Sequence, residues 1–335
     1  MRRMLLAALL VILAGCSPPA PPVAAPSPAP SSPAKTAKLT PEALRALPSA
    51  SQRYRLVLIV KTRNNPFFSP MIAAAYAQAA QMDVDLDVQS PAQETDKEGQ
   101  FNLVSQIVAR GVDAILIAPA DSKGIVPALK AAQKQGVVVV NLDNLVDRAT
   151  LEANDLELGG YISADNEAGG RLAGEEMVKA LGGAGEVAVL EGIRGADNAE
   201  ARKRGFQEAV DGKLTIVASE TAEWETEKAY AKAQSLLAAH PNLRGLFAAN
   251  DKMALGAVRA IKEAGKTGQI TVIGYDNIPD VKPLLDSGAM HATIEQHPDR
   301  MGHYGVALAV GLLEKKVAPG GTLMAPLELI PGKDQ

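Results

Sequence analysis

The run Leu56-Val57-Leu58-Ile59-Val60, which leads into Asn64-Asn65-Pro66-Phe67-Phe68, decides the fold. A continuous apolar run of this length is typical of a strand that is buried on both faces of a parallel sheet. Three later apolar runs end in the same way, at residues 141–144, 250–251 and 274–276. Ligands of open parallel α/β sheets bind beyond the carboxyl ends of the strands. The polar and aromatic residues at these ends therefore predict a pocket for a polyhydroxylated ligand.

Apolar runs alternate with helical stretches along almost the whole chain after residue 53. We predict strands at 54–60, 84–89, 113–118, 137–142, 161–164, 186–191, 214–219, 245–249, 270–274 and 290–294. We predict helices at 70–82, 99–109, 124–135, 167–181, 200–210, 225–239 and 252–264. Several of these helices end at a glycine, which suits a left-handed C-terminal cap. So many strands exceed one compact sheet, and the pattern predicts an α/β fold of two doubly wound parallel-sheet lobes.

The first 16 residues are typical of a bacterial lipoprotein signal. Arg2-Arg3 precedes an apolar stretch at 4–14, which is shorter than the about 20 residues that span a bilayer. The stretch ends in Leu13-Ala14-Gly15-Cys16, and Cys16 is the only cysteine of the chain. We predict that 1–15 is a signal peptide and that Cys16 is lipidated, rather than an ordinary secretory peptide with an incidental cysteine. The mature protein would be anchored in the cell envelope, in the periplasm or another extracytoplasmic place.

Residues 16–53 are predicted to be a Pro/Ala-rich tether that begins at the lipidated Cys16. Ten of the 22 prolines lie between residues 17 and 52. Such a composition buries too little apolar surface to fold, so we expect a disordered, stiff tether with a reach on the order of 100 Å. Residues 40–44 are expected to add one short helical turn.

The remaining chain is long enough for a large core, and its charge excludes one class of function. The formal net charge is −4, and scattered Lys and Arg side chains form no basic stripe for nucleic acid. No apolar run after the signal has spanning length, so we expect contact with the membrane through the lipid anchor only. The four histidines show no metal-ligand spacing, and neither a metal nor a cofactor is predicted.

From Tyr54 onward the chain resembles the periplasmic sugar-binding proteins of ABC transporters, of the ribose-binding type. The resemblance covers nearly all of the folded part and rests on motifs that match in kind and order. These are 64–68, 142–143, 164–166, 250–257, 274–276 with 279–280, and 292–294 with Gln296 and 298–299. The resemblance implies the type I periplasmic binding protein fold, in which three hinge crossings join the two lobes and the ligand is trapped between them.

The resemblance also implies where the lobes divide. The N-terminal lobe would comprise 54–164 and 297–326, and the C-terminal lobe 165–296 and 327–335. The hinge crossings would lie near Ala164-Asp165, Gln296-His297 and Pro326-Leu327.

Ligand contacts follow from the resemblance residue by residue. Phe67 and Phe68 would stack on one face of a sugar ring and Trp224 would cover the other, because sugar faces present C–H groups that aromatic rings bury well. The ring hydroxyls need polar partners that donate or accept hydrogen bonds. These partners would be Asn65, Asp143, Asn250, Tyr275, Asp276 and Gln296.

Three positions depart from the ribose-binding pattern. Lys61 replaces a serine and Asn144 replaces an arginine, and both are expected among the ligand-binding residues, whereas Glu200 stands where a second ligand-binding arginine would fall. Asn198 or Arg202 is expected to take over the role of that arginine. Because lysine and asparagine do not replace the donor fork of an arginine, a polyol, a cyclitol such as inositol, or another pentose or hexose is as well supported as ribose.

Several residues have a structural alternative. Trp224, Phe67 and Phe68 are also plausible as core residues, with the cleft favoured for Trp224 and for at least one of the phenylalanines. Lys61 could equally be a solvated lysine at the end of a strand or a hydrogen-bond donor in the pocket. Asp251 is predicted to cap the helix that follows, and Asp165-Asn166 to form a hinge and a helix cap.

These observations predict a monomeric solute-binding protein, and not an enzyme. It would capture a small sugar, polyol or cyclitol and deliver it to the permease of an ABC importer. The same binding role could serve a chemoreceptor or sensor kinase, which the sequence leaves open. A glycosidase that uses Asp143 and Asp276 as acid and base is less well supported, because amides and aromatic rings surround these carboxylates. A transcription repressor is excluded by the signal peptide and tether at its N-terminus.

Overall fold

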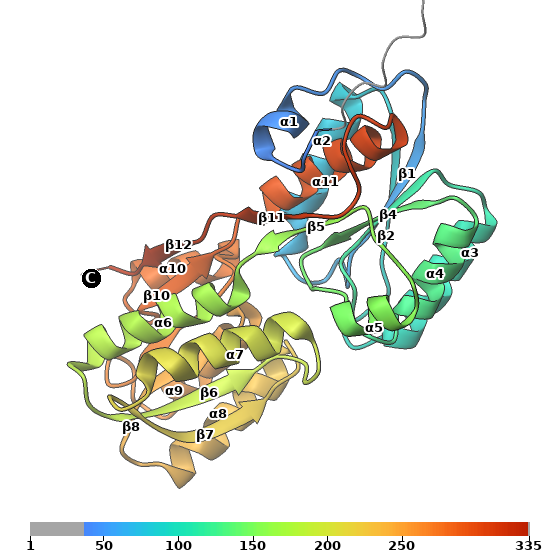
Figure 1. Cartoon of the computed structure of the whole chain (residues 1–335). Helices are drawn as coiled ribbons and strands as arrows, with labels where there is room; N and C mark the ends of the chain where they lie inside the picture. The colour runs from blue at the N-terminus through green and yellow to red at the C-terminus, as the bar shows by residue number, and fades with distance from the viewer. Residues whose placement is uncertain (1–36, 334–335) are drawn as a thin grey trace, which may run out of the picture. The chain divides into compact units, whose positions relative to one another are not determined.

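The computed structural model describes residues 37–333, so the predicted signal peptide, Cys16 and the first part of the tether lie outside the described residues. The described chain builds two six-stranded sheets, each flanked by helices (Figure 1). We call the first sheet with its helices the N-terminal lobe and the second sheet with its helices the C-terminal lobe. Two sheets of mostly parallel strands confirm the predicted fold class. Among residues 37–333, no helix is both long and apolar enough to cross a membrane.

The sheet of the N-terminal lobe is parallel throughout and buried on both faces. Its strand order is β11-β5-β4-β3-β1-β2. The strands are β1 (Arg55–Ile59), β2 (Asp85–Gln89), β3 (Ala114–Ile117), β4 (Val138–Leu142), β5 (Gly160–Ala164) and β11 (Thr322–Ala325). In β1, Leu56 and Leu58 face one core while Val57 and Ile59 face another, as the period of two in a strand requires. Alternate residues of this apolar run therefore pack into two different hydrophobic cores.

Helices cover both faces of this sheet (Figure 1). Those of one face, α2 and α11, pack against each other, and so do α3 and α4 of the other face. The helices of this lobe are α1 (Pro41–Arg45), α2 (Phe68–Gln81), α3 (Lys97–Ala109), α4 (Val126–Lys134), α5 (Arg148–Ala153) and α11 (Pro298–Leu313).

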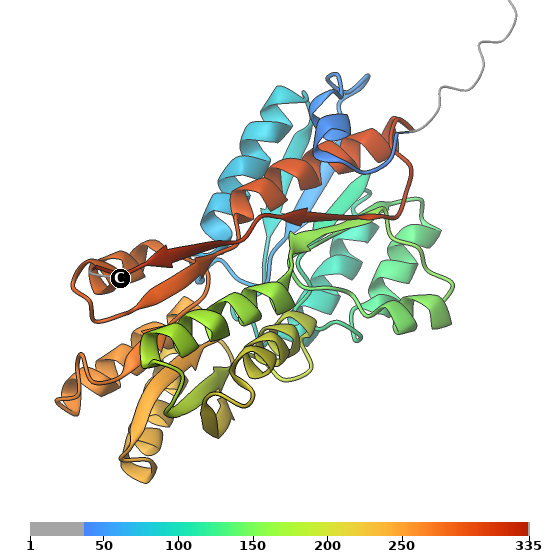
Figure 2. The ribbon, with the colours of Figure 1, turned by 60° about the vertical axis from the view of Figure 1, so that its left-hand side comes forward.

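The C-terminal lobe repeats the arrangement with one antiparallel edge strand. Its strand order is β12-β10-β9-β8-β6-β7, and only β12 runs antiparallel to its neighbour. The strands are β6 (Glu186–Glu191), β7 (Thr215–Thr221), β8 (Leu243–Ala248), β9 (Thr271–Ile273), β10 (Ala292–Glu295) and β12 (Glu328–Pro331). The helices are α6 (Asn166–Leu181), α7 (Asp197–Val210), α8 (Thr226–Ala239), α9 (Asp251–Glu263) and α10 (Lys282–Asp286), with a 3₁₀ turn at Pro279–Val281. Helices α6 and α7 pack together, as do α8 and α9 (Figure 2).

Both lobes have the strand order of a doubly wound sheet with one switch point. Counted within each lobe, the first five strands lie in the order 2-1-3-4-5, which places the switch point beside β1 in one lobe and beside β6 in the other. Ligands of such sheets bind at the carboxyl ends of the strands near this point. A ligand-binding site is therefore expected at the loops that follow β1 and β6.

The chain passes between the two sheets three times. It does so between β5 and α6, between β10 and α11, and between β11 and β12. On this topology we propose the lobe division predicted from the sequence, 54–164 with 297–326 and 165–296 with 327–335.

All ten predicted strands and all seven predicted helices are present, with ends shifted by a few residues. Several further elements were not predicted, namely β11, β12, α5, α10 and α11. Helix α11 is buried nearly all round, so its sequence shows no polar face to reveal a helical period. Strands β11 and β12 are four residues each, too short for a clear alternation.

The prediction of a disordered tether is wrong for residues 37–53. Thr40 caps the short helix α1, which confirms the helical turn predicted at 40–44. Leu44 is buried in the N-terminal core, and Ala37 pairs with Val317. Ser51 donates from its backbone N–H and its hydroxyl to Glu314, at 2.8 and 2.6 Å. The Pro/Ala-rich composition concealed the leucines that attach this segment to the lobe.

Replacing Leu44 by alanine tests the contribution of this segment. Leu44→Ala is expected to destabilise the protein by about 2–5 kcal/mol, because it removes a buried leucine side chain and leaves a cavity. Glu42→Ala on the exposed side of the same helix is the control and should change stability by less than about 1 kcal/mol. Urea unfolding measures both variants, and an unchanged midpoint for Leu44→Ala would show that the segment adds no stability.

Candidate functional site

One cavity between the lobes is lined by side chains from the carboxyl ends of both sheets. The empty space between these side chains, including the part open to solvent, is about 230 Å³. The N-terminal lobe contributes Lys61, Asn65, Phe67, Phe68, Glu94 and Asp143, and the C-terminal lobe contributes Asn198, Arg202, Trp224, Asn250, Asp276 and Gln296.

The structure brings together eleven of the thirteen predicted ligand residues in this lining. Asn144 and Tyr275 do not line the cavity, whereas Glu94 lines it without having been predicted. The ligand contacts themselves remain predictions. The lining mixes aromatic rings, amides and charged groups.

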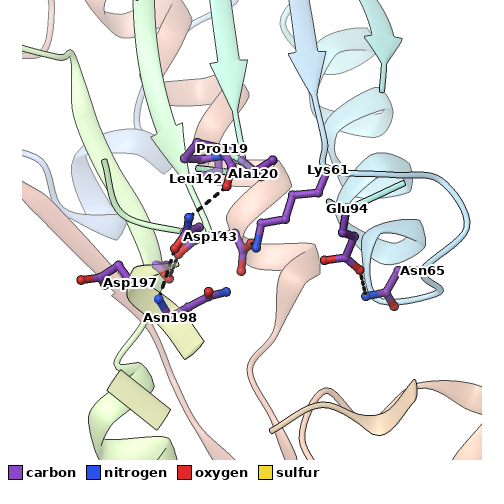
Figure 3. Close-up of polar contacts among 12 residues, drawn as sticks. Lys61, Asn65, Glu94, Pro119, Ala120, Leu142, Asp143, Asp197 and Asn198 are labelled. Atoms are coloured by element: carbon purple, nitrogen blue, oxygen red, sulfur yellow. Dashed lines mark hydrogen bonds and ion pairs between the residues drawn. The ribbon is translucent and has the colours of Figure 1, made fainter. Parts of the chain in front are cut away.

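Lys61 and Asp143 form a buried ion pair in the N-terminal lobe. Lys61 Nζ lies 3.0 Å from Asp143 Oδ2, and both side chains are almost fully buried. Lys61 follows β1 and Asp143 follows β4, so the pair joins two strand ends that lie on either side of β3 (Figure 3). Asp143 has a positive φ of 58°, and its carbonyl oxygen accepts hydrogen bonds from the hydroxyls of Tyr161 and Ser163. Lys61 therefore lies in the cavity lining, and the alternative of a solvated lysine at the strand end is wrong.

Glu94 and Asn65 form a second polar pair beside Lys61 (Figure 3). Asn65 Nδ2 donates to Glu94 Oε1 at 2.8 Å, and Asn65 Oδ1 accepts from the Phe67 N–H at 3.1 Å. Burial raises the pKa of Glu94, and the Lys61 ammonium opposes that rise. Glu94 follows β2, so the strand-end pattern contained the signal that would have revealed it.

Aromatic rings from both lobes complete the lining. Phe67 and Phe68 meet edge to face with ring centroids 5.0 Å apart, and both line the cavity. Trp224 lines it from the C-terminal lobe and is 2% exposed. Its φ of 67° is rare for a bulky residue and turns the indole inward, where Nε1 has no hydrogen-bond partner. The indole packs so tightly on Gly192 that a Cβ there would overlap its ring.

Arg202 is the buried cation of the C-terminal lobe. Its Nε donates to Asn166 Oδ1 at 2.9 Å and its Nη1 to the Ala249 carbonyl oxygen at 2.7 Å. Its Nη2 donates to Gln296 Oε1 at 3.3 Å. The guanidinium carbon lies 3.7 Å from the centroid of the Tyr275 ring. The ring of Tyr275 thus packs against the guanidinium of Arg202. Tyr275 does not line the cavity, so its position differs from the predicted one in the ligand site.

Asp276 lies next to Arg202 and is held by Gln296. Gln296 Nε2 donates to Asp276 Oδ1 at 2.7 Å, and Arg202 Nη1 lies 3.5 Å from the same oxygen. Burial raises the pKa of Asp276, and the Arg202 guanidinium opposes the rise. Asp276 follows β9 and Gln296 follows β10, so the ends of two adjacent strands bring this hydrogen-bonded pair together.

The roles of Asn250 and Asp251 differ from the prediction. Asn250, and not Asp251, caps helix α9, with its Oδ1 accepting from the Met253 N–H at 2.9 Å. Asn250 also lines the cavity. Asp251 is buried and accepts from the Tyr275 and Ile278 N–H groups and the Thr293 hydroxyl. Burial raises the pKa of Asp251 to about 7, against these hydrogen bonds.

At the start of α6 the cap prediction is correct. Asp165 is the N-cap residue, and its Oδ1 accepts from the Ala168 N–H at 2.9 Å. Asn166 is the first residue of the helix and bonds to Arg202. Glu200, where the ribose-binding pattern has an arginine, accepts from the Gly195 N–H and lies outside the lining. Arg202 and Asn198 of the same helix lie in the lining instead.

Asn144 uses its side chain within the protein and does not line the cavity. Its Nδ2 donates to the Pro119 carbonyl oxygen at 2.9 Å and to Ser122 Oγ at 3.2 Å. Its Oδ1 accepts from the Asn198 N–H of the C-terminal lobe at 3.1 Å (Figure 3). The prediction that Asn144 contacts a ligand is therefore not met by its position.

The lining offers both donors and acceptors around a space walled by aromatic rings. Carboxylates accept from hydroxyls, amides do both, and the two cations donate. Aromatic faces bury the C–H groups of a sugar ring. Within residues 37–333, no cluster of three or more His, Cys, Asp or Glu side chains is placed to hold a metal ion. The arrangement is suited to holding a small polyhydroxylated molecule.

Comparisons with known proteins identify the family of this chain. The family model of the periplasmic binding protein domain matches residues 56–316. The D-ribose/D-allose-binding protein of Pseudomonas aeruginosa is 39% identical over 285 residues, which are 83% of this chain and 89% of that protein. The ribose import binding protein RbsB of Escherichia coli K12 is 36% identical over 267 residues, 79% of this chain and 87% of that protein.

A solved structure of similar fold carries a sugar. It is the periplasmic solute-binding protein of an ABC transporter from Actinobacillus succinogenes 130z with bound D-allose. The TM-score is 0.79 at 37% identity, and the match covers 83% of this chain and 98% of that chain. This chain therefore belongs to the periplasmic binding protein family, among the sugar-binding proteins of ABC transporters, which confirms the resemblance.

Replacing Gly192 by alanine tests the position of the indole. The added methyl group would displace Trp224 from the cavity wall, because the two cannot occupy the same space. Gly192→Ala is expected to shift the fluorescence of Trp224, the only tryptophan, to longer wavelength. Gly124→Ala, in a loop of the other lobe, is the control. Emission identical to the wild type in Gly192→Ala would contradict the tight contact.

Proposed function

We propose that this protein is a lipid-anchored solute-binding protein that captures a small sugar or polyol between its lobes and delivers it to an ABC importer. The observation that carries the proposal is the buried cavity between the two sets of strand ends. Aromatic rings from both lobes wall it, and charged and amide groups surround the remaining space.

D-Ribose and D-allose are the first ligands that we propose. The relatives named for these sugars support them. At the cavity, Lys61 supplies an ammonium donor next to Asp143, and Arg202 supplies a guanidinium next to Asp276. These two cation–carboxylate pairs lie in opposite lobes. A ligand with hydroxyls on both sides of its ring satisfies both pairs at once.

Binding and closure are one event in this proposal. Each lobe holds about half of the polar lining, so a ligand makes its full set of contacts only when both lobes surround it. Such a ligand stabilises the closed arrangement by its differential contacts with the closed and open forms. The closed monomer is then the form that the permease recognises.

We favour binding without chemistry. Asp143 is paired with Lys61, and Asp276 with Arg202 and Gln296. Carboxylates held in this way are suited to accepting hydrogen bonds from hydroxyls. The relatives are binding proteins, which supports the same conclusion.

A thermal-shift screen of the chain from Ser17 onward tests the ligand class. The panel contains D-ribose, D-allose, other pentoses and hexoses, linear polyols, inositols and amino-acid controls. A ligand that binds only the folded state raises the melting temperature by mass action. A shift with a sugar or polyol and none with amino acids is expected. A well-folded protein that responds to none of the sugars and polyols would contradict the proposal.

Substitutions of two cavity-lining residues test the site. Trp224→Ala and Asp276→Ala should each weaken sugar binding at least tenfold, through loss of a ring wall and of a hydrogen-bond acceptor. Asp276→Asn keeps the shape and guards against misfolding of the alanine variant. Calorimetric titration measures affinity, with Glu42→Ala as the control. Wild-type affinity in the Trp224 and Asp276 variants would refute the assignment.

The proposed anchor has its own test. Cys16→Ser should move the protein from the membrane fraction to the soluble fraction of a bacterial host, because one thioether-linked lipid is then missing. Sugar binding by the purified variant should be unchanged. A variant that stays in the membrane fraction would refute lipidation at Cys16.

A further inference from the structure

The N-terminal end of helix α7 reaches the N-terminal lobe through two backbone hydrogen bonds. The Asp197 N–H donates to Ser122 Oγ at 3.2 Å, and the Asn198 N–H donates to Asn144 Oδ1 at 3.1 Å. Ser122 follows β3 and Asn144 follows β4, whereas α7 belongs to the C-terminal lobe. The two bonds therefore join the lobes directly, without a ligand between them.

Helix α7 lacks a cap of its own. The first backbone N–H groups of a helix have no partner within the helix and are usually satisfied by the side chain of the N-cap residue. The N-cap residue of α7 is Ala196, whose side chain has no polar atom to accept a bond. Ser122 and Asn144 accept two of these N–H groups instead. The helix of one lobe is thus capped by side chains of the other.

Asn144 and Ser122 are prepared for this role within their own lobe. Both side chains are buried. Asn144 Nδ2 is held by the Pro119 carbonyl oxygen and by Ser122 Oγ, which turns Oδ1 toward α7. Neither residue lines the cavity. The two acceptors are therefore fixed before the lobes meet.

The same contact positions a cavity residue. Asn198 gives its backbone N–H to Asn144, while its side chain lines the cavity with Oδ1 buried and without a hydrogen-bond partner. A buried polar atom without a partner is costly, and a ligand hydroxyl would satisfy it. The bond to Asn144 thus holds the amide of Asn198 where a ligand needs it.

We infer that Ser122 and Asn144 form a closure latch, which caps α7 across the lobes and positions Asn198 instead of contacting the ligand. This inference rests on the proposed function, because it describes how the lobes are held around the captured solute. It also gives Asn144 a role in place of the donor fork of the arginine found there in the ribose-binding pattern. In the open form, water takes over the two N–H groups.

The chain offers a matched pair of variants for one of the two bonds. Asp197→Pro removes the N–H that Ser122 accepts, and Asp197→Ala removes the same side chain but keeps the N–H. Asp197 is the first helical residue, where proline is well tolerated, and Ala196 has the extended backbone that precedes a proline. The difference between the two variants therefore reports the hydrogen bond alone. Ser122→Ala and Asn144→Ala remove the acceptors.

Sugar binding is followed by the fluorescence of Trp224 in a stopped-flow instrument, with the best ligand of the thermal-shift screen. Ser122→Ala, Asn144→Ala and Asp197→Pro should each bind about fivefold more weakly, as expected for a net hydrogen bond. The loss should lie in faster release and not in slower association, because the latch forms only on closure. Ser122→Ala combined with Asp197→Pro should weaken binding no more than either alone. Wild-type release rates in all three single variants would overturn the latch.

Hydrogen exchange with and without the best ligand of the thermal-shift screen, sugar or not, separates the latch from the proposed function. In the wild type, the ligand should slow exchange at the amides of Asp197 and Asn198, because closure gives both N–H groups a partner. This protection should be lost at Asp197 in Ser122→Ala and at Asn198 in Asn144→Ala. Full protection in both variants would overturn the latch even if sugar binds. Protection by a ligand that is neither a sugar nor a polyol, lost in the variants, would refute the proposed ligand class and support the latch.

Discussion

The buried guanidinium of Arg202 is the constraint on which the C-terminal half of the site depends. A charge removed from water is tolerated only when it is paired and hydrogen-bonded. Arg202 obtains these partners from the start of α6, the end of β8 and the crossing after β10, through Asn166, Ala249 and Gln296. Asp276 and the ring of Tyr275 complete its surroundings. One side chain thus connects four segments at the carboxyl ends of the strands, and the loss of an acceptor would leave a buried N–H of the guanidinium without a hydrogen bond.

In the N-terminal lobe, the buried charges balance each other in a different ion pair. Lys61 and Asp143 neutralise each other at the ends of β1 and β4, on either side of β3, with Asn65 and Glu94 beside them. Each lobe therefore carries a preformed polar group of its own, and the two groups face one cavity. Because neither group needs the other lobe for its charge balance, the lobes can separate without leaving a charge unpaired. In the proposed mechanism, closure adds the contact of both groups with one solute and the capping of α7.

Much of this site was predictable, and the errors have a common physical origin. Strand-end residues such as Asn65, Asp143 and Asp276 were found because a parallel sheet places all its carboxyl ends on one edge. Glu94 was missed, although it obeys the same rule, because it lies five residues beyond the end of β2 within a polar loop. The cap of α9 was assigned to Asp251 in place of Asn250, since adjacent residues offer the same capping chemistry and only the backbone geometry selects one. Residues 37–53 were assigned to the tether because composition does not reveal that a single leucine is buried.

By itself, the sequence determined the alternation of strands and helices, the two-lobed fold and the chemical character of the pocket. These follow from local periodicity and from the topology of parallel sheets, both of which act over short stretches of chain. Only the tertiary structure decided that Lys61 pairs with Asp143, that Tyr275 supports Arg202 and that Asn144 faces α7 and not the cavity. These contacts depend on distances between segments that are far apart in the chain. Asp143 and Asn144 are adjacent in sequence, yet the side chain of Asp143 lines the cavity while that of Asn144 bonds to the other lobe.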